Sequence, residues 1–458
     1  MRDLLVLSAA ELRAAYEAGA ISPVEVTEAV VAAAEESSAR LNAFTWIDRD
    51  GALAQAKAAE RRWRANAALS PLDGVPISIK DNLGLQGSPT LFGSRAVSAC
   101  DAALPDSPAV ARLREAGAVL FAKTTLPDFA HKIVTDSPGH GVTRNPWSEL
   151  HSPGGSSGGA AAAVAAGIGP LALATDGGGS IRIPAAFTGT FGFKPSFGRV
   201  PHYPRGPFAL LSHVGPISRT VDDAATMMSV IARPDVRDWY SLPPLQDDYA
   251  MKLPGGVADL AVAYSPRLGL DAPADPEAVE VMRAAVDRLR SAGMSVEEVD
   301  PPLMAECSRI HGILWCVFCA RLAERIGEAR KLLDDSLREL ASIGESIDAA
   351  TLMTALLQRG EIGRSVNEFM QRYDVLLCPT HTGSAPKLDE IDPKHPPTPV
   401  FTQWCNQLGL PAASLFCGLA PQGLPVGLQL VGRRFEDGAL LAAGRAVEAV
   451  LGSPRWPR

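Results

Sequence analysis

The chain has 458 residues, of which 47% are hydrophobic and 21% are charged, and its formal net charge is −8. These proportions are typical of a globular protein with a large core, and they exclude an intrinsically disordered chain. The acidic balance disfavours nucleic acid and anionic membrane surfaces as partners, because both attract basic proteins.

The cysteines and the apolar runs limit the cellular setting. Cys316 and Cys319 form a CxxC inside an apolar stretch, which we interpret as a buried segment, and no second CxxC is present to complete a zinc site. No secretory apolar core is present at the amino terminus, and the longest apolar run, residues 160–174, is too short to span a membrane. We therefore expect a cytoplasmic protein. The seven cysteines are scattered and odd in number, so no disulfide framework is predicted for Cys100, Cys307, Cys316, Cys319, Cys378, Cys405 and Cys417.

Helix starts are the first structural signals along the chain. A short amphipathic helix is predicted to begin at Ser107-Pro108, followed by a strand over residues 118–123. The same order recurs, with a helix from Asp275-Pro276 and a strand over residues 294–299. Nearer the amino terminus, two starts carry a capping box, in which a serine and a glutamate three residues later satisfy each other's backbone N–H groups: Ser8 with Glu11, and Ser22 with Glu25.

This alternation of helix and apolar strand is typical of an α/β protein whose sheet is largely parallel and covered on both faces. The weakest stretch lies at about residues 233–258, which are rich in proline and aspartate. It fits a domain linker and a surface excursion of one large domain equally well.

Glycine is concentrated in one region. Residues 154–198 hold 12 of the 41 glycines, with several serines and almost no charge, and such a stretch brings backbone N–H groups close to a ligand. A phosphate-binding loop is one interpretation, but no Lys-Ser/Thr follows as in a P-loop. A hydrolase nucleophile elbow is another, because GGSSG at 154–158 matches GxSxG, but turn residues precede it where a strand is needed.

A third interpretation treats the two serine-containing pieces as one site. Residues 171–175 predict a buried strand, after which Ser180 lies in a run of backbone N–H groups suited to an oxyanion hole. A serine nucleophile needs a base. Lys80 is well placed at the end of a short predicted strand, on the same face as Ser78, although Lys123 fits as well by spacing alone.

These segments resemble the amidase signature family. The matching runs are GGSSGG (154–159), DGGGSIRIPAAF (176–187) and FGFKPSFGR (191–199), in the family's order and spacing. Further matches extend the resemblance over nearly the whole chain: GVPISIKDN (74–82), KTTLPDF (123–129), TRNPW (143–147), GPISR (215–219), DVLLCPT (374–380) and GLPVGLQLVG (423–432).

The resemblance implies an amidase signature fold, an α/β domain with a central mixed sheet flanked on both faces by helices. We expect one domain over residues 1–458, with a signature core at about 70–220 and a substrate-pocket excursion at about 233–400. In the family's Ser–cis-Ser–Lys set, Ser180 is the acylated nucleophile, Ser156 the relay serine after a cis peptide bond, and Lys80 the base. The oxyanion donors are the N–H groups of Gly177, Gly178, Gly179 and Ser180.

The resemblance also implies supporting roles. Ser157, Asp176 and Arg182 fall on positions that brace the site, and Ala130 falls where the family places a carbonyl beside the substrate. Pocket walls are expected from residues 124–136, from the aromatic-rich stretch around Trp315 and Phe318, and from residues 401–406. Four aromatic residues in these stretches favour an aromatic or apolar substrate group, although each fits a place in the core equally well: Trp315, Phe318, Phe401 and Trp404.

The implied function is hydrolysis of small-molecule amides, as in aryl acylamidases, with carbamates (urethanes) and esters as further substrates. No metal or other cofactor is expected, and no nucleic-acid or membrane partner; a homodimer fits the family. The alternative is the glutaminase subunit of the tRNA-dependent amidotransferase, which acts with partner subunits and usually carries glutamine where this chain has Ile183. Gly177 also departs from the family, whose usual residue there is threonine or isoleucine.

Overall fold

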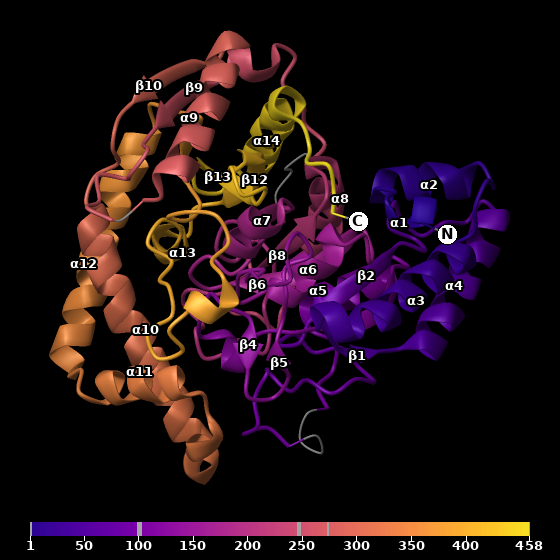
Figure 1. The fold of residues 1–458 in the computed structure, drawn as a ribbon, viewed down its shortest axis with the longest axis horizontal. Coiled ribbons are helices and arrows are strands. Elements are labelled where there is room, and N and C mark those ends of the chain that lie inside the picture. Colours follow the sequence, from indigo (N-terminus) through magenta and orange to yellow (C-terminus); the bar gives the residue numbers. More distant parts are fainter. Residues whose placement is uncertain (1, 99–102, 245–248, 273, 458) are drawn as a thin grey trace.

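The computed structural model of the chain describes residues 2–98, 103–244, 249–272 and 274–457. Cys100, one of the cysteines considered above, lies outside these residues. In the described ranges, eleven strands form one sheet in the spatial order β1-β3-β2-β6-β8-β7-β12-β13-β11-β9-β10 (Figure 1). The strands of this sheet are β1 (Phe44–Ile47), β2 (Pro76–Lys80), β3 (Val119–Thr124), β6 (Leu171–Asp176), β7 (Phe191–Lys194), β8 (His213–Ser218), β9 (Ala261–Tyr264), β10 (Ser295–Glu298), β11 (Val375–Pro379), β12 (Ala412–Leu419) and β13 (Pro425–Gly432), and a separate ribbon pairs β4 (Asp136–Ser137) with β5 (Gly141–Val142).

Helices lie on both faces of the sheet, as the resemblance implied. The α-helices are α1 (Arg2–Leu5), α2 (Ala9–Glu17), α3 (Pro23–Leu41), α4 (Arg49–Arg64), α5 (Pro108–Glu115), α6 (Gly158–Ala165), α7 (Arg182–Thr188), α8 (Val221–Ile231), α9 (Pro276–Ser291), α10 (Met304–Ile326), α11 (Asp335–Glu345), α12 (Ala349–Met370), α13 (Gln403–Leu408) and α14 (Asp437–Leu451). Short 3₁₀ helices are η1 (Asp128–Ala130), η2 (Gly256–Asp259), η3 (Gly327–Leu332) and η4 (Leu388–Glu390).

The sheet is mixed, as the resemblance to the amidase signature family implied, and the expectation of a largely parallel sheet from the helix and strand rhythm was wrong. Among the described strands, β2 runs parallel to β3 and β6, and β9 runs parallel to β10 and β11. Every other pairing between described strands of the sheet is antiparallel. The reason is local. A parallel pair needs a crossover connection of a dozen or more residues, whereas the link from β12 to β13 is a short turn that allows only antiparallel pairing.

The predicted helix and strand starts are confirmed. Both capping boxes form, before α2 and before α3. α5 and α9 begin at the expected prolines, and β3 and β10 follow them in the expected places. The CxxC lies on α10 with both thiols buried, as its apolar surroundings indicated.

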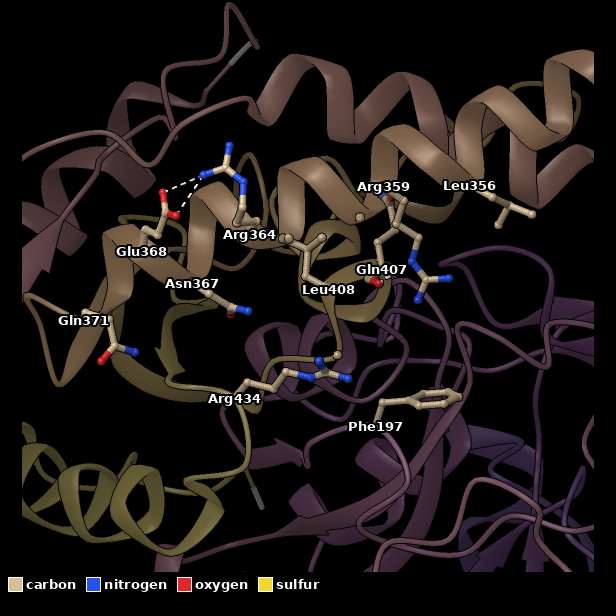
Figure 2. Close-up of a pocket in the computed structure, with 13 residues that line it drawn as sticks. Phe197, Leu356, Arg359, Arg364, Asn367, Glu368, Gln371, Gln407, Leu408 and Arg434 are labelled. Atoms are coloured by element: carbon tan, nitrogen blue, oxygen red, sulfur yellow. Dashed lines mark hydrogen bonds and ion pairs between the residues drawn. The ribbon is translucent and has the colours of Figure 1, made fainter.

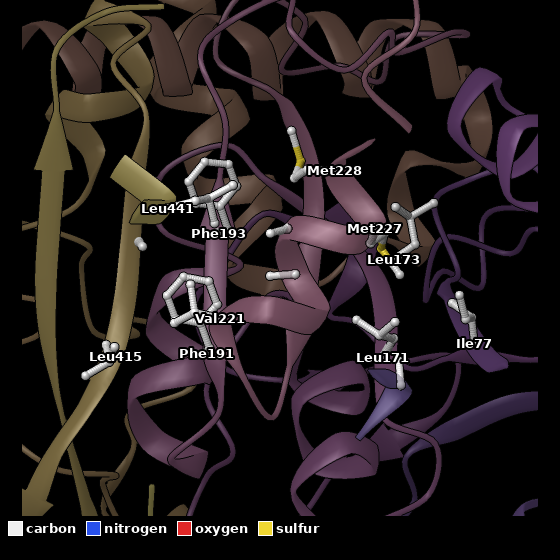
Figure 3. Packing of buried hydrophobic residues seen from close by; sticks show 14 of the residues in the cluster. Ile77, Leu171, Leu173, Phe191, Phe193, Val221, Met227, Met228, Leu415 and Leu441 are labelled. Carbon is white, nitrogen blue, oxygen red and sulfur yellow. The ribbon is translucent and has the colours of Figure 1, made fainter. Parts of the chain in front are cut away.

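Side-chain alternation along β6 divides the core between the two faces. Leu171 and Leu173 belong to the largest hydrophobic cluster, together with Met227 of α8 (Figure 3). Ala172 and Ala174 point the other way and pack with α6. Because these alanines are small, α6 lies close to the sheet. Ser156 and Ser157, just before α6, therefore lie at the ends of β2 and β6.

The region after β8 forms the rest of the molecule. α10 packs against both α11 and α12, and this helical layer lies along one side of the sheet domain (Figure 1). The described part of the 233–258 stretch packs on the main body: Asp238 forms an ion pair with Arg205 at 2.8 Å, and the Leu242 N–H donates to Gly198 O. This packing is that of a surface excursion. The single-domain boundaries stay a prediction.

In the described ranges, no single helix is long and apolar enough to cross a membrane. One bent pair, α11 with α12, meets the length and composition criteria together, with an angle of 99° between its two helices.

Candidate active site

Lys80 ends β2 with its side chain fully buried. Ile77 and Ile79 of the same strand point into the largest hydrophobic cluster, so the period-two alternation turns Ser78 and Lys80 to the opposite face. There the Lys80 Nζ lies 2.7 Å from Ser156 Oγ, 2.8 Å from Ser157 Oγ and 3.3 Å from Thr175 O. Its surroundings are hydroxyl and carbonyl groups, and no carboxylate in the described ranges forms an ion pair with it.

These contacts define which proton each group carries. Thr175 O can only accept, and Ser157 Oγ already donates its hydrogen to Thr175 O at 3.1 Å, so it accepts from Lys80. A neutral amine has two hydrogens and one lone pair. As an ammonium, Lys80 donates to all three groups. As a neutral amine with its two hydrogens directed at Ser157 Oγ and Thr175 O, it would turn its lone pair toward the Ser156 hydroxyl, which would then be the donor.

Burial lowers the pKa of Lys80 well below its ordinary value, because an ammonium group is poorly solvated in the interior. The negative charge of Asp176 opposes this shift but does not overcome it. The neutral form of the Lys80 amine is therefore reached at a lower pH than in a free lysine.

Ser156 and Ser180 lie on neighbouring pieces of chain. The Gly155–Ser156 peptide bond is cis, as the resemblance implied, and Ser157 N–H donates to Ser180 O at 3.1 Å. The side chains of Ser156 and Ser180 line the same small cavity. The structure thus brings Lys80, Ser156 and Ser180 together, although 76 residues separate the first two and 24 the last two.

The glycine run after β6 folds into a tight loop. Gly179 has a φ of +143°, and a Cβ there would lie 2.2 Å from Thr402 Oγ1, so only glycine fits. Its N–H donates to Asp176 Oδ1 at 2.7 Å, which leaves this group engaged by the protein. A Cβ at Gly177 would lie 3.4 Å from the Trp315 ring, so the space beside this departure from the family pattern is filled by an aromatic side chain.

The buried ion pair between Arg182 and Asp176 holds this loop in place. Arg182 Nη2 lies 2.9 Å from Asp176 Oδ1, and both side chains are fully buried. Burial alone would raise the pKa of Asp176, but the charge and hydrogen bonds of Arg182 lower it below its ordinary value. Asn406 donates to the Asp176 carboxylate and its carbonyl, each at 2.9 Å. Asp176 is thus held ionised as a fixed acceptor for the loop.

Lys123, the rival base by spacing, has a different environment. Its Nζ forms an ion pair with Asp81 at 3.1 Å and donates to Leu83 O and Thr90 Oγ1, each at 2.9 Å. A paired ammonium with its donors in use is a structural cation, and these three partners include no candidate nucleophile.

Two cavities meet at Ser180. The inner cavity, about 30 Å³, is lined by Ser156 and Ser180, and the outer cavity, about 500 Å³, extends toward α10 and α11. Ser180, Ala130 and Trp315 line both. Trp315 stacks on Phe208 with ring centroids 3.9 Å apart, and its indole N–H donates to His131 O. The outer cavity has a mainly apolar wall, so it suits an aromatic or aliphatic group.

No three His, Cys, Asp or Glu side chains in the described ranges gather as a metal site would. Ser156 lines the same cavity as Ser180, and the Lys80 amine contacts Ser156 behind it.

Comparison with known proteins identifies the family. The profile of the Amidase family matches residues 25–441. The chain belongs to the amidase signature family. Among curated proteins, it is 34% identical to an acylamidase of Rhodococcus erythropolis over 98% of this chain and 96% of that protein. It is 37% identical to a subunit of the glutamyl-tRNA(Gln) amidotransferase of Anaeromyxobacter sp. (strain K), over 98% and 97%.

Solved structures of other amidase signature proteins have the same fold. A bacterial aryl acylamidase of this family superimposes with a TM-score of 0.88 and 32% identity, covering 97% of this chain and 96% of that one. A 6-aminohexanoate cyclic dimer hydrolase also has a TM-score of 0.88, with 27% identity and 99% of both chains covered. Our chain is accordingly an amidase signature hydrolase of C–N bonds.

The four aromatic residues expected in the pocket separate in this amidase. Trp315 lies at the junction of the cavities, and Phe318 packs edge-on against Phe208 without lining either of them. Phe401 and Trp404 are fully buried in a hydrophobic cluster, and neither lines a cavity at Ser180. For these two the core interpretation describes the structure, because α13 is short and buried along its whole length.

Several neighbours of the site were missed by the sequence analysis. His311 packs face to face with Trp315, lines the outer cavity, and lies 3.3 Å from the position of a Cβ on Gly178. Burial lowers its pKa to about 3, so the ring is neutral. The four-residue spacing from Trp315 on one helix was the available signal. Phe208 comes from a segment with no local pattern that indicates a site, whereas Thr402 and Asn406 lie in the 401–406 stretch expected as a pocket wall, without their contacts to the 176–179 loop being predicted.

Proposed function

We propose that this protein hydrolyses small-molecule amides through a Ser180 acyl-enzyme, with Ser156 as relay and Lys80 as base. One observation carries the proposal: a fully buried amine, with which no described carboxylate pairs, lies 2.7 Å from the hydroxyl of Ser156, beside the cavity that holds Ser180. A buried lysine surrounded by acceptors and hydroxyls is suited to accept a proton at moderate pH.

In the proposed first step, neutral Lys80 takes the proton of Ser156 while Ser156 takes the proton of Ser180. Ser180 Oγ then forms a bond to the carbonyl carbon, and the carbonyl π electrons move to its oxygen. The backbone N–H groups of Gly177, Gly178 and Ser180 are the proposed donors to this oxyanion, because Gly179 already donates to Asp176. Ser157 and Arg182 position Lys80 and Asp176 respectively, and touch no substrate.

The tetrahedral intermediate collapses when the C–N bond breaks. The leaving nitrogen takes a proton from Ser156, which regains one from the Lys80 ammonium. Water then attacks the acyl-enzyme by the same relay and releases the acid. Esters and carbamates carry an acyl carbon of the same kind, so they are further proposed substrates.

The proposed substrate carries an aromatic or apolar group in the outer cavity, beside Trp315 and Ala130. The name of the Rhodococcus relative and that of the aryl acylamidase structure support this substrate class. The test is turnover of an aryl anilide, a primary amide and an aryl carbamate by the purified chain, with Ser180→Ala as the matched control. We expect turnover of the anilide by the wild type and loss of at least about 10³-fold in the variant. Equal rates in the two proteins would remove Ser180 from the mechanism.

A second candidate follows from the 37% identity to a subunit of an amidotransferase. In that role, the chain would act only with partner subunits. The purified chain alone separates the two, because turnover of an anilide without any added protein supports the stand-alone amidase, and its absence with all three substrates supports the partner-dependent role.

A further inference from the structure

A second large cavity lies away from Ser180. It has a volume of about 710 Å³ and is bounded by α12, by the end of α13 and by Arg434. None of its lining residues lines the cavities at Ser180. Figure 2 shows Arg359 on α12 and Arg434 on the opposite segment, with Phe197 beside them. We refer to this space as the arginine cavity.

The charges of the arginine cavity do not balance. Three guanidinium groups line it, those of Arg359, Arg364 and Arg434, and the carboxylate of Glu368 is the only acidic side chain among its described lining residues. Glu368 is engaged by Arg364, whose Nη1 lies 2.8 Å and 2.9 Å from its two oxygens (Figure 2). No ion pair joins Arg359 or Arg434 to any carboxylate of the described ranges.

The Arg359 guanidinium is held in place by hydrogen bonds to backbone carbonyls. No carboxylate of the described residues forms an ion pair with it. Its Nε donates to Gln407 O at 2.6 Å and its Nη2 to Leu210 O at 3.5 Å, so neutral carbonyls orient the guanidinium and Nη1 keeps its donors. Burial and the positive charge of Arg434 both lower the pKa of Arg359. The two guanidinium groups therefore repel each other across the cavity.

Arg434 is held by packing. Its guanidinium carbon lies 4.5 Å from the centre of the Phe435 ring, and its Nε lies 3.6 Å from the position of a Cβ on Gly409. A chain of net charge −8 has many carboxylates, yet its described part places none against these two cations. Two oriented guanidinium forks facing one space form a typical receptor for a phosphate or carboxylate group.

We propose that the arginine cavity binds a small organic oxyanion, a phosphate or carboxylate held between Arg359 and Arg434. The apolar side chains of Leu356, Leu408 and Phe197 line the same space and would contact the organic part of the ligand. Asn367 and Gln371 also line this space and carry amide groups. The volume fits a ligand of ordinary metabolite size.

The test is calorimetric titration of the full-length chain with inorganic phosphate, phenyl phosphate and benzoate at fixed ionic strength. We expect saturable binding that weakens as sodium chloride is raised, with phenyl phosphate tighter than inorganic phosphate because of the apolar wall. Phosphate-type and carboxylate-type ligands are distinguished by which of phenyl phosphate and benzoate binds more tightly.

Arg434→Gln is the decisive variant. Within the described residues, Arg434 packs on the Phe435 ring and near Gly409 and forms no ion pair, so the substitution removes a charge from the cavity without breaking one. It should weaken binding by about tenfold or more, since one charge-assisted contact is lost. Arg372→Gln is the matched control: this arginine also lies over aromatic rings, those of Phe369 and Tyr373, but it does not line the cavity. Its affinity should equal that of the wild type.

Two results would overturn the proposal: no saturable binding of any of the three probes to the wild type, or equal affinities in the wild type and Arg434→Gln. Amide turnover by the same preparation is measured in parallel, so failure of this site is distinguishable from failure of the proposed hydrolase.

Discussion

Lys80 and Lys123 are two buried lysines on adjacent parallel strands, and burial lowers the pKa of both, that of Lys80 more strongly. Lys123 faces a carboxylate, Asp81, whereas Lys80 faces the hydroxyls of Ser156 and Ser157. An ion pair keeps a buried ammonium charged, and hydroxyls allow it to become neutral. If Lys80 is the base as we propose, the partner of a buried lysine, more than its burial, separates a structural cation from a base.

The largest expected effect comes from removing each amine in turn. Lys80→Met should lower kcat/KM for an anilide by about 10²–10⁴-fold, because the proposed general base is lost, with the fold retained. Lys123→Met should instead lower the free energy of unfolding by about 3–5 kcal/mol, because Asp81 is left buried without its partner. Steady-state kinetics and urea unfolding at pH 7.5 measure both. A Lys123→Met variant that is stable but inactive would contradict the assignment of Lys123 as a structural cation.

Acidic pH should reduce the loss of unfolding free energy caused by Lys123→Met. Burial raises the pKa of Asp81 to about 6, with Lys123 opposing the shift. Protonation below this value removes the unpaired charge, so the destabilisation of Lys123→Met should shrink when unfolding is repeated at pH 5. A loss of stability that is the same at both pH values would indicate that Asp81 stays ionised.

Asp176→Asn tests the carboxylate that holds the oxyanion loop. Arg182 then lies fully buried without its counter-ion, and we expect a loss of about 3–5 kcal/mol in unfolding free energy. Asp222→Asn is the control: its side chain is 61% exposed and pairs with Arg445, so its loss should be below about 1 kcal/mol. Similar losses in both variants would contradict the role given to burial.

The pH profile of the wild type reports Lys80. The base must be unprotonated, so kcat/KM for an uncharged substrate should rise about tenfold per pH unit below the pKa of Lys80 and level off above it. Because burial lowers that pKa, the plateau should begin below the ordinary lysine value of about 10.4. A rate that still rises tenfold per unit at pH 10 would mean that Lys80 titrates like a solvated lysine.

The smallest effect concerns the pocket. Trp315→Ala should raise KM for an aryl anilide by about tenfold, because an aromatic wall of the cavity is removed, and it should leave KM for acetamide nearly unchanged. Phe318→Ala is the control, since its ring packs on Phe208 outside the cavities. Equal changes in both variants would point to loss of packing.

The sequence predicted the candidate site residues that lie within short contiguous motifs. Lys80, Ser156 and Ser180 lie in contiguous motifs, and the strand alternation at Lys80 already turned it away from the apolar core. It did not predict Phe208, which tertiary packing brings from a distant segment, or the contacts that Asn406 and Thr402 make with the loop at residues 176–179. Aromatic side chains near the site were the least predictable, because Trp315 and Trp404 both follow helical patterns and only packing decides which one meets a cavity.

The strand directions were misjudged for a related reason. Helix and strand rhythm in the sequence described β2, β3 and β10 well, and each of these strands has a parallel neighbour. No α-helix lies between β7 and β8 or between β12 and β13 in the chain, and both pairs are antiparallel. The absence of a helix between two successive strands was the available signal for this difference.

The most direct test of the account is the pKa of the Lys80 amine itself, measured by nuclear magnetic resonance on protein labelled with ¹⁵N at lysine Nζ, with Lys80→Met to assign the signal. If Lys80 is the base, we expect a resonance that is absent from Lys80→Met and titrates well below the ordinary lysine value of about 10.4. A Lys80 amine that titrates at or above this value would contradict it, because the group would then be an ammonium under working conditions and could not accept the proton of Ser156.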